Sequence, residues 1–250
     1  KNLNDYFFFL LLFFLGSVLM RSAGCIVNDI FDKEFDKKVS RTKNRPIASN
    51  QVSIKLGILY TLMLCLLAFL VLINFNKLTI ILALGSMPLA FTYPLMKRFT
   101  YWPQLFLGIT FNYGLILGWT AIQGEINAIS IIFYFGAIFW TLGFDTIYGY
   151  QDLKDDEIIG IKSTSIKFKK NPKLFLIICY IIFVISLILT SVSMRLNSVF
   201  YFFALIPTAH LFFYQIYNFN FKNPKNCLKI FKSNNFFGAI ILCNILIGKF

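Results

Sequence analysis

The stretch CIVNDIFDKEFDKKVSRTKNRPIAS, residues 25 to 49, joins the end of a long apolar run to a dense mixture of acidic and basic residues. If the helix that enters this stretch continues to Asp36, then Asn28, Asp32 and Asp36 recur at i, i+4 and i+8 and lie on one helical face. Carboxylates at this spacing repel one another by about 0.2–0.5 kcal/mol per pair unless a cation lies between them. The pattern therefore predicts a divalent-metal site on this face, with Asp29 as a further member.

The composition around this stretch is that of a membrane protein. Of the 250 residues, 58% are hydrophobic, only 14% are charged, and 31 are phenylalanine. The apolar segments are long enough to cross a bilayer as helices, and they lack the alternation of a transmembrane barrel. The sequence thus predicts an all-α, polytopic helical bundle with about eight transmembrane helices, forming one domain over residues 1–250. The predicted segments are 6–29, 52–73, 78–95, 103–122, 129–149, 173–192, 197–217 and 234–249.

The basic residues predict how these segments are oriented in the bilayer. The formal net charge is +13, but the bases lie between apolar segments rather than on a soluble face, so we expect no nucleic-acid partner. Most of the 24 lysines and arginines lie in the loops after the first, third, fifth and seventh segments. The positive-inside rule then predicts that these loops face the cytoplasm of a bacterial inner membrane or the matrix of a mitochondrial inner membrane.

A second acidic window has the sequence LGFDTIYGYQDLKDDEIIGIKST, residues 142 to 164. Nine of the 11 acidic residues fall in the two windows, and only Asp5 and Glu125 lie elsewhere. The spacing of Asp145, Asp152 and Asp156 predicts a second helical face, with Tyr148 on it. By the charge distribution, both windows open on the same side of the membrane.

Two carboxylate clusters among many bases predict a common ligand, a pyrophosphate held through Mg²⁺, which prefers one or two carboxylates together with phosphate oxygens. Five bases are placed to neutralise the remaining phosphate charge: Arg41, Arg45, Lys97, Arg98 and Lys162. An apolar interior below such a site suggests a lipid diphosphate. The alternative of solvated loop charges does not explain why the acids recur at helical spacing.

Two isolated polar residues and one rival function remain. Arg21 lies within the first segment, where it could pair with Asp29 or contact an anionic substrate. His210, the only histidine, is interpreted as a packed or hydrogen-bonded helix residue. A divalent-cation transporter would also use two acid clusters, but it requires acids deep within the helices, whereas these concentrate at one interface.

Long stretches of the chain resemble a known family. RSAGCIVNDIFDKEFDKKVSRTKNRPIAS (21–49), with its NDxxDxxxD core, and DTIYGYQDLKDDEIIGIKSTSIKF (145–168) closely resemble the two signatures of the UbiA superfamily of intramembrane prenyltransferases. Within it they look most like the 4-hydroxybenzoate polyprenyltransferases of ubiquinone biosynthesis. Residues 93–108 and the NNFFG stretch, 234–238, also resemble that subfamily.

This resemblance implies a helical bundle around a central cavity that binds Mg²⁺, a polyprenyl diphosphate and 4-hydroxybenzoate. It also implies transfer of the prenyl group to the ring carbon ortho to the hydroxyl. Homogentisate, a naphthoate or haem remain alternative acceptors. The family has nine membrane helices, and its first has no counterpart here, so we expect the domain to lack that helix. The implied metal and diphosphate residues are Asn28, Asp32, Asp36, Asp152 and Asp156, with Asp29 and Asp155 as further motif members and Arg98 near the substrates.

Overall fold

The computed structural model describes residues 3–39 and 41–249, and its regular structure over those residues is helical. Within them, eight helical stretches are long and apolar enough to cross a membrane. They confirm the eight predicted segments and the all-α membrane fold. The stretches are Asp5–Asp36, Ile54–Leu72, Lys77–Phe99, Pro103–Gln123, Ala128–Gly149, Pro172–Ser193, Ser198–Ile216 and Pro224–Lys249.

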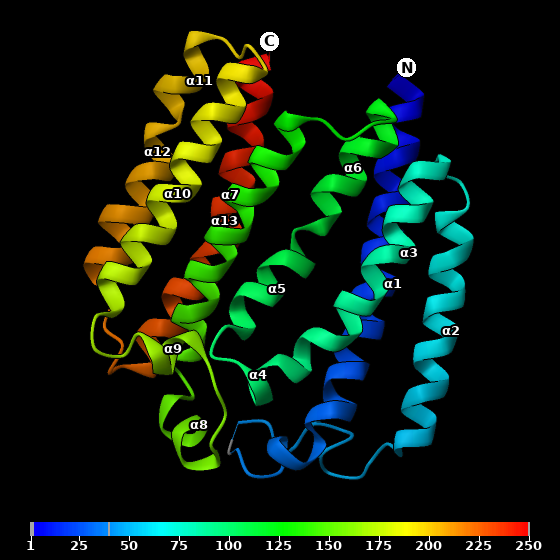
Figure 1. Cartoon of the computed structure of the whole chain (residues 1–250), viewed down its shortest axis with the longest axis vertical. Coiled ribbons are helices and arrows are strands. Elements are labelled where there is room, and N and C mark those ends of the chain that lie inside the picture. The colour runs from blue at the N-terminus through cyan, green and yellow to red at the C-terminus, as the bar shows by residue number, and fades with distance from the viewer. Residues whose placement is uncertain (1–2, 40, 250) are drawn as a thin grey trace. The chain divides into compact units, whose positions relative to one another are not determined.

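The chain divides into two compact units. The first contains the described residues up to Leu95 together with Gly114–Ile126. Its elements are α1 (Leu3–Asp36), α2 (Ile54–Leu72), α3 (Lys77–Thr92), the 3-10 turn η1 (Tyr93–Leu95) and, from its second residue on, α6 (Tyr113–Gln123). In this unit α2 and α3 both pack against α1 (Figure 1).

Polar caps begin the second and third helices of this unit. The Ser53 hydroxyl accepts a hydrogen bond from the Leu56 amide, and the Asn76 side chain accepts one from the Thr79 amide. Asn76 also donates to the Thr120 carbonyl at 2.8 Å, and the hydroxyls of Thr79 and Thr120 lie 3.0 Å apart. Asn76, the last residue of the α2–α3 connection, therefore caps α3 and, together with Thr79, attaches it to α6.

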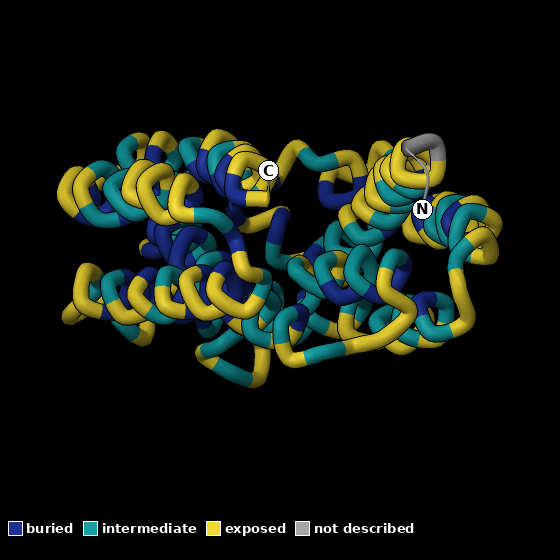
Figure 2. Tube along the Cα trace, turned by 90° about the horizontal axis from the view of Figure 1, so that it is seen from above, coloured by how far each residue is buried: buried dark blue, intermediate teal, exposed yellow. Residues whose placement is uncertain are grey.

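The second unit contains Met96–Tyr113 and the described residues from Asn127 onward. Its core forms where α7 packs against α5, α10 and α13. Figure 2 shows buried turns, in dark blue, inside this group of helices and exposed turns, in yellow, on its outer faces. The elements are α4 (Met96–Phe99), α5 (Pro103–Phe111), α7 (Ala128–Gly149), α8 (Leu153–Ile159), α9 (Thr164–Lys167), α10 (Pro172–Ser193), α11 (Ser198–Phe203), α12 (Leu205–Ala209), the π-helix η2 (His210–Ile216) and α13 (Pro224–Lys249).

Glycines on α7 allow its close approach to α10. A Cβ built on Gly143 would lie 2.5 Å from the Tyr180 ring, and one on Gly136 would lie 2.5 Å from the Cβ of Ser186. Tyr180 itself is fully buried. The two helices therefore meet at a distance that a larger side chain on α7 would prevent, as is common where membrane helices associate through small residues.

The last helix begins earlier than the sequence predicted. The predicted segment 234–249 is wrong at its start, because α13 runs from Pro224. Lys225, Lys229 and Lys232 interrupt the apolar run, but they are all exposed and recur at i, i+4 and i+7 on one face. Cys227 and Ile230 are buried on the other face. The first turns of α13 are thus amphipathic, so an apolar window does not detect them.

Besides Lys77–Phe99, which continues from α3 through the 3-10 turn η1 into α4, two of the membrane-length stretches are interrupted. Asn112 ends α5, and its side-chain amide donates to the Gly108 and Ala137 carbonyls and to the Thr141 hydroxyl. Farther along, Pro207 lies within α12, where its ring cannot donate the backbone hydrogen bond of a regular helix, and the π-helix η2 follows. Neither break was predicted from the sequence.

The π-helix contributes to a buried polar network. In a π-helix, residues five positions apart come into register, and the Gln215 amide nitrogen lies 3.4 Å from His210 Nδ1. The fully buried Gln215 also accepts a hydrogen bond from the Tyr180 hydroxyl at 2.6 Å and donates to Asn234 Oδ1 at 3.0 Å. The same Asn234 oxygen accepts from the Trp140 indole at 2.9 Å.

This network explains two features of the sequence. His210 is a packed helix residue, as predicted, with its ring stacked on Tyr214 and against Phe237. Asn234, the first residue of the NNFFG stretch, joins α13 to both α7 and η2. Side-chain hydrogen bonds of this kind specify how membrane helices pair, because the surrounding lipid offers no competing partner.

Candidate functional site

The first acid cluster lies on a single helix. Because α1 continues without interruption to Asp36, the predicted arrangement of Asn28, Asp32 and Asp36 on one face is confirmed. Asp32 and Asp36 are only 4% and 7% exposed, and Asn28 and Asp29 are half-buried. The end of a membrane-length helix therefore presents four oxygen-bearing side chains over about two and a half turns.

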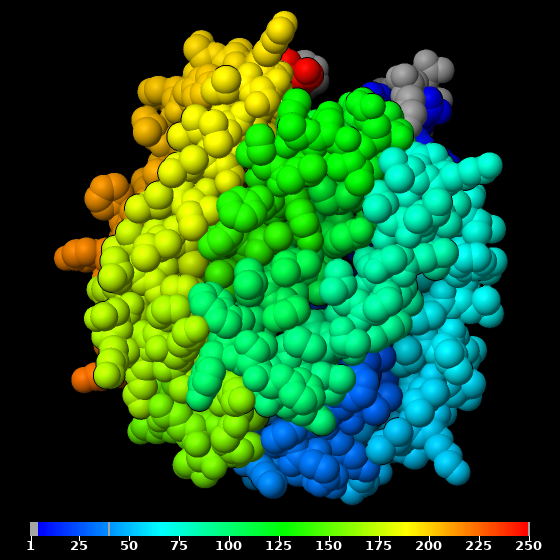
Figure 3. All heavy atoms as spheres, in the orientation of Figure 1, coloured from blue at the N-terminus to red at the C-terminus, as the bar shows by residue number. Residues whose placement is uncertain are grey.

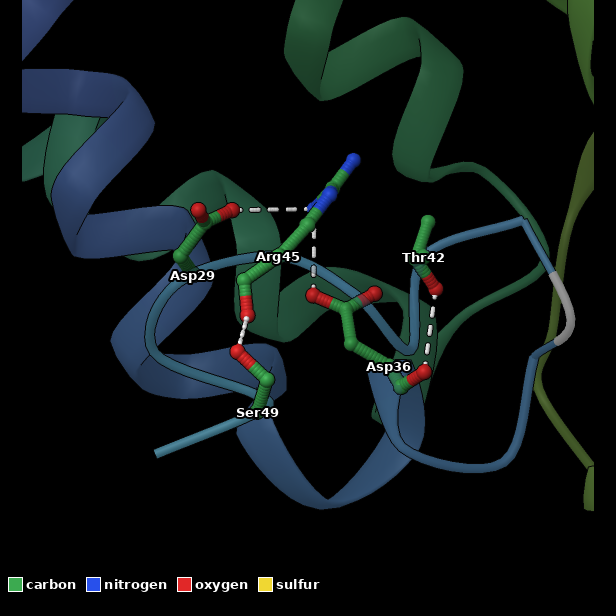
Figure 4. Close-up of polar contacts among 5 residues, drawn as sticks. All are labelled: Asp29, Asp36, Thr42, Arg45 and Ser49. Carbon is green, nitrogen blue, oxygen red and sulfur yellow. Dashed lines mark hydrogen bonds and ion pairs between the residues drawn. The ribbon is translucent and has the colours of Figure 1, made fainter. Parts of the chain in front are cut away.

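Arg45 bridges two of these acids. Its Nη1 lies 2.9 Å from Asp29 Oδ1 and 3.0 Å from Asp36 Oδ2 (Figure 4). The guanidinium is partly buried, and the Asp36 side chain is 10% exposed. A guanidinium is charged at any physiological pH, so it offsets the repulsion that carboxylates on one helical face would otherwise have.

The chain after α1 folds into turns that place Arg45 there. The buried Thr42 donates its hydroxyl to the Asp36 carbonyl at 3.2 Å, and its own carbonyl accepts the Arg45 amide at 2.9 Å. The Arg45 carbonyl accepts bonds from the amide and the hydroxyl of Ser49. Ile47 is 4% exposed and lies against the face of α2 at Gly57. These turns form the blue surface at the lower end of α1 in Figure 3.

The second acid cluster is divided between two helices, so the prediction of one continuous face is wrong. Asp145 lies on α7, which ends at Gly149, and Asp152 is the residue before α8. The chain turns there because Gly149 is closely approached by Ser165 and because Tyr150 is buried against Phe219. The spacing of Asp152 and Asp156 is nevertheless helical, since the Asp156 amide donates to the Asp152 carbonyl at 2.9 Å.

The turn also gives Tyr150 a distinct environment. Burial, with a smaller contribution from Cys227, raises the pKa of the Tyr150 hydroxyl above its ordinary value. The hydroxyl therefore stays protonated at neutral pH. It supports the turn through packing rather than by supplying charge to the acid cluster.

Two of the predicted phosphate-binding bases are brought together within the second unit. The Lys162 amide donates to the Lys97 carbonyl at 2.9 Å, and Lys162 Nζ lies 3.3 Å from the Phe99 carbonyl. Gly160, with φ of 81°, ends α8 in the left-handed conformation that glycine adopts most readily, and so directs the chain toward α4. Arg98 is exposed on α4 beside Lys97.

Buried polar side chains attach the start of α9 to α5 and α7. The Gln104 side-chain oxygen Oε1 accepts a hydrogen bond from the Thr164 amide at 2.9 Å, and the Ser165 hydroxyl donates to the Thr146 backbone carbonyl at 2.8 Å. The hydroxyls of Thr146 and Thr164 lie 2.6 Å apart. Sequence reasoning missed this group. Its one signal was a glutamine and a threonine inside otherwise apolar spans, which indicates a buried partner.

The remaining predicted residues lie as follows. Arg41 and Arg21 are both exposed, and Asp155 is half-buried on α8. Because the ion-pair partner of Asp29 is Arg45, the alternative in which Arg21 pairs with Asp29 is not found among the described residues. Tyr148 lies on α7 with its ring 4.4 Å from that of Phe231.

The donor chemistry of the first cluster fits Mg²⁺. Carboxylate and amide oxygens are the hard ligands that this ion prefers. Over residues 3–39 and 41–249, no group of three histidine, cysteine or acidic side chains is assembled closely enough to hold a metal ion by itself. Mg²⁺ does not require such a group, because it is usually held by one or two carboxylates together with substrate phosphates rather than by a cage of protein ligands.

Comparisons with known proteins identify the family of the chain. Residues 2–241 match the UbiA prenyltransferase family. The chain is 41% identical to the mitochondrial 4-hydroxybenzoate polyprenyltransferase of Homo sapiens, over 97% of this chain and 65% of that protein. It is 42% identical to the 4-hydroxybenzoate geranyltransferase 2 of Lithospermum erythrorhizon, over 93% of this chain and 76% of that protein. The chain thus spans about two thirds of the length of its animal relatives.

Solved structures show the same fold. The structure resembles the apo form of a UbiA homologue from Aeropyrum pernix, with a TM-score of 0.77 and 20% identity over 99% of this chain and 90% of that one. It also resembles a UbiA homologue from Archaeoglobus fulgidus bound to GPP and Mg²⁺, with a TM-score of 0.74 and 17% identity over 95% and 85% of the two chains. By its matched residues, its relatives and its fold, the chain belongs to the UbiA prenyltransferase family.

Proposed function

We propose that this protein transfers a polyprenyl group from polyprenyl diphosphate to the ring carbon of 4-hydroxybenzoate ortho to its hydroxyl, as a step of ubiquinone biosynthesis. The observation that carries the proposal is the acid face of α1, where Asp32 and Asp36 are buried at the end of a membrane-length helix. A soluble metabolite does not require carboxylates at that position, whereas the diphosphate of a lipid does. The mammalian and plant relatives named for 4-hydroxybenzoate support the choice of acceptor.

Each acid cluster has a role in this reaction. Asn28, Asp32 and Asp36 of the first cluster, and Asp152 and Asp156 of the second, would hold Mg²⁺ and the diphosphate, with Asp29 and Asp155 next to them. When bound, Mg²⁺ supplies Lewis-acid stabilisation of the negative charge on the leaving diphosphate. The archaeal homologue solved with GPP and Mg²⁺ supports this use of the metal.

Basic and aromatic residues complete the proposed chemistry. Five bases would pair with the diphosphate oxygens and stabilise the charge that develops as the carbon–oxygen bond breaks: Arg41, Arg45, Lys97, Arg98 and Lys162. Tyr148 would line the substrate site. Arg21, which has no role in neutralising Asp29, would contact the carboxylate of the aromatic acid. The apolar helices exclude water, which would otherwise intercept the allylic cation.

The proposed location follows from the charge pattern. We infer that the acid-bearing loops face the mitochondrial matrix or the bacterial cytoplasm, because those loops carry most of the basic residues. The relatives named as mitochondrial support a mitochondrial location. In sealed vesicles with the matrix or cytoplasmic side facing out, protease should cleave a tag placed in the 37–52 loop and leave a tag in the 74–76 loop intact, and the reverse result would refute this topology.

The test is a transfer assay. Membranes containing the protein are incubated with ring-labelled 4-hydroxybenzoate, a polyprenyl diphosphate and Mg²⁺, and the lipid product is extracted and counted. We expect labelled product with Mg²⁺ and none with excess EDTA. Homogentisate and a naphthoate added as competitors should remain unprenylated. Prenylation of one of these acceptors, with none of 4-hydroxybenzoate, would refute the choice of acceptor.

A matched pair of variants separates the site from general effects of charge. Asp32→Ala removes an acid of the first cluster, and Glu125→Ala removes an exposed acid outside both clusters. We expect the first variant to lose turnover and the second to keep it. Both should insert into the membrane in equal amount, measured by quantitative blotting.

A further inference from the structure

Arg45 occupies the position where the first acid cluster needs a cation. One nitrogen, Nη1, contacts Asp29 and Asp36 at 2.9 and 3.0 Å. These acids are seven positions apart, so side chains from two successive turns of α1 converge on one guanidinium nitrogen, and the buried Asp32 lies between them in sequence. An arginine from the loop that follows α1 thereby pairs with Asp29 and Asp36, two of the carboxylates that the sequence assigned to a metal site.

The loop is built to deliver this side chain. As described above, hydrogen bonds to Thr42 and Ser49 constrain the backbone on both sides of Arg45, and the buried Ile47 anchors the loop against α2. Thr42 also bonds to the carbonyl of Asp36 itself. The arginine and one of its acceptors therefore belong to the same hydrogen-bonded turn (Figure 4).

We propose that Arg45 is an exchangeable counter-cation, which occupies the carboxylates of the first cluster until Mg²⁺ arrives with a diphosphate. This inference rests on the proposed function and goes beyond it by assigning an order of events. A guanidinium and a divalent ion repel each other and compete for the same carboxylate oxygens. Metal binding therefore costs the two charge-assisted hydrogen bonds of Arg45, unless another anion accepts them.

A diphosphate is such an anion. Its oxygens accept the planar fork of an arginine well, so the displaced Arg45 regains its hydrogen bonds on the substrate. Mg²⁺ and diphosphate then bind with positive coupling, since each removes a cost that the other would bear alone. In the absence of substrate, Arg45 keeps Asp29 and Asp36 paired, which lowers the affinity of the cluster for free divalent ions.

The deciding measurement is metal affinity without substrate. The full chain in lipid nanodiscs is titrated with Mn²⁺, and free Mn²⁺ is followed by electron paramagnetic resonance. Arg45→Gln removes the competing cation, and Lys43→Gln removes one positive charge from an exposed position of the same loop. We expect Arg45→Gln to bind Mn²⁺ at least about tenfold more tightly than wild type, the change that corresponds to the loss of only one of the two charge-assisted hydrogen bonds of Arg45. Lys43→Gln should stay within about twofold of wild type, because an exposed charge is screened.

If Arg45→Gln binds Mn²⁺ no more tightly than Lys43→Gln, Arg45 is a structural ion pair and the proposal is wrong. Arg45→Lys should fall between wild type and Arg45→Gln, because an ammonium keeps the charge but not the planar fork. Circular dichroism and gel filtration establish that each variant is folded before titration.

Wild-type protein provides a readout that needs no variant. Hydrogen exchange of the 41–49 amides should accelerate when Mn²⁺ is added alone, and slow again when inorganic pyrophosphate follows. If Mn²⁺ alone slows hydrogen exchange of these amides, the metal does not displace Arg45 and the proposal is wrong. Neither the Mn²⁺ titration nor the hydrogen-exchange measurement involves turnover. If both give the expected results but the transfer assay gives no product, the proposed activity is refuted and the displacement of Arg45 is not.

Discussion

Asn234 and Asn244 provide a matched test of the buried polar network. Both are buried on α13, ten residues apart, and both can be replaced by leucine, which has the same branched arrangement of side-chain heavy atoms. Asn234 accepts hydrogen bonds from Trp140 and Gln215 and donates to two carbonyls of its own helix. Within the described residues, neither side-chain atom of Asn244 has a hydrogen-bond partner. The same substitution should therefore have opposite effects at the two positions.

The magnitudes follow from what each leucine removes. Asn234→Leu leaves two donors, the Trp140 indole and the Gln215 amide, without their acceptor. Hydrogen bonds between membrane helices contribute about 0.6 kcal/mol each on average and at most about 1.7. We therefore expect Asn234→Leu to lower the free energy of unfolding by about 1–3 kcal/mol. Asn244→Leu removes an amide that is buried without a partner, which costs about 1–3 kcal/mol, and should raise the free energy of unfolding by about 1 kcal/mol.

The assay is equilibrium unfolding in mixed micelles, titrated with SDS and followed by circular dichroism, which does not depend on the Trp140 fluorescence that Asn234→Leu would alter. A double-mutant cycle with Trp140→Phe should give a coupling energy to Asn234 of about 0.6–1.7 kcal/mol. If both leucine variants lower the free energy of unfolding by the same amount, packing at α13 and not hydrogen bonding decides its stability. That result would refute the reasoning.

Three further outcomes are expected. Asp152→Ala should abolish prenyl transfer as completely as Asp32→Ala, with the protein still inserted, measured by the labelled-lipid assay and by blotting. Gly143→Ala should lower the free energy of unfolding by about 1–3 kcal/mol because its Cβ meets the Tyr180 ring, whereas Gly118→Ala, which meets nothing within 4 Å, should be neutral or stabilising in the same SDS titration. Activity lost in EDTA should return with added Mg²⁺ and not with Ca²⁺, whose longer oxygen distances and larger coordination number suit this donor set less well.

Much of the fold could be predicted because lipid exposure leaves a strong trace in the sequence. Each membrane-length helix appears as an apolar run, so all eight were found. The start of α13 was missed because its three exposed lysines lie on one face, which a measure of mean hydropathy cannot resolve. The break at Asn112 was missed because two of the acceptors that stabilise it, the Ala137 carbonyl and the Thr141 hydroxyl, lie on α7.

Part of the candidate site could likewise be predicted from the sequence, and part could not. The face formed by Asn28, Asp32 and Asp36 depends only on helical spacing, so the sequence was sufficient to predict it. The contacts of Arg45 depend on the turns of a loop, and spacing alone could not distinguish a phosphate ligand from a partner for Asp29 and Asp36. The prediction that Asp145, Asp152 and Asp156 share one helical face was wrong because the packing of Gly149 and Tyr150 ends α7 before Asp152.

The π-helix η2 has a consequence for how this chain tolerates changes of length. A π-turn holds one residue more than the α-turn it replaces, so η2 accommodates an extra residue without interrupting the helix. Deleting a single residue between His210 and Gln215 should restore α-helical winding and rotate Gln215 by roughly 100° relative to the preceding turns, away from Tyr180 and Asn234. In an exposed loop, by contrast, a one-residue deletion changes only the length of the connection between two helices. In this short segment it would separate the two sides of a buried hydrogen-bond network, so the chain length here is as constrained as the residue types.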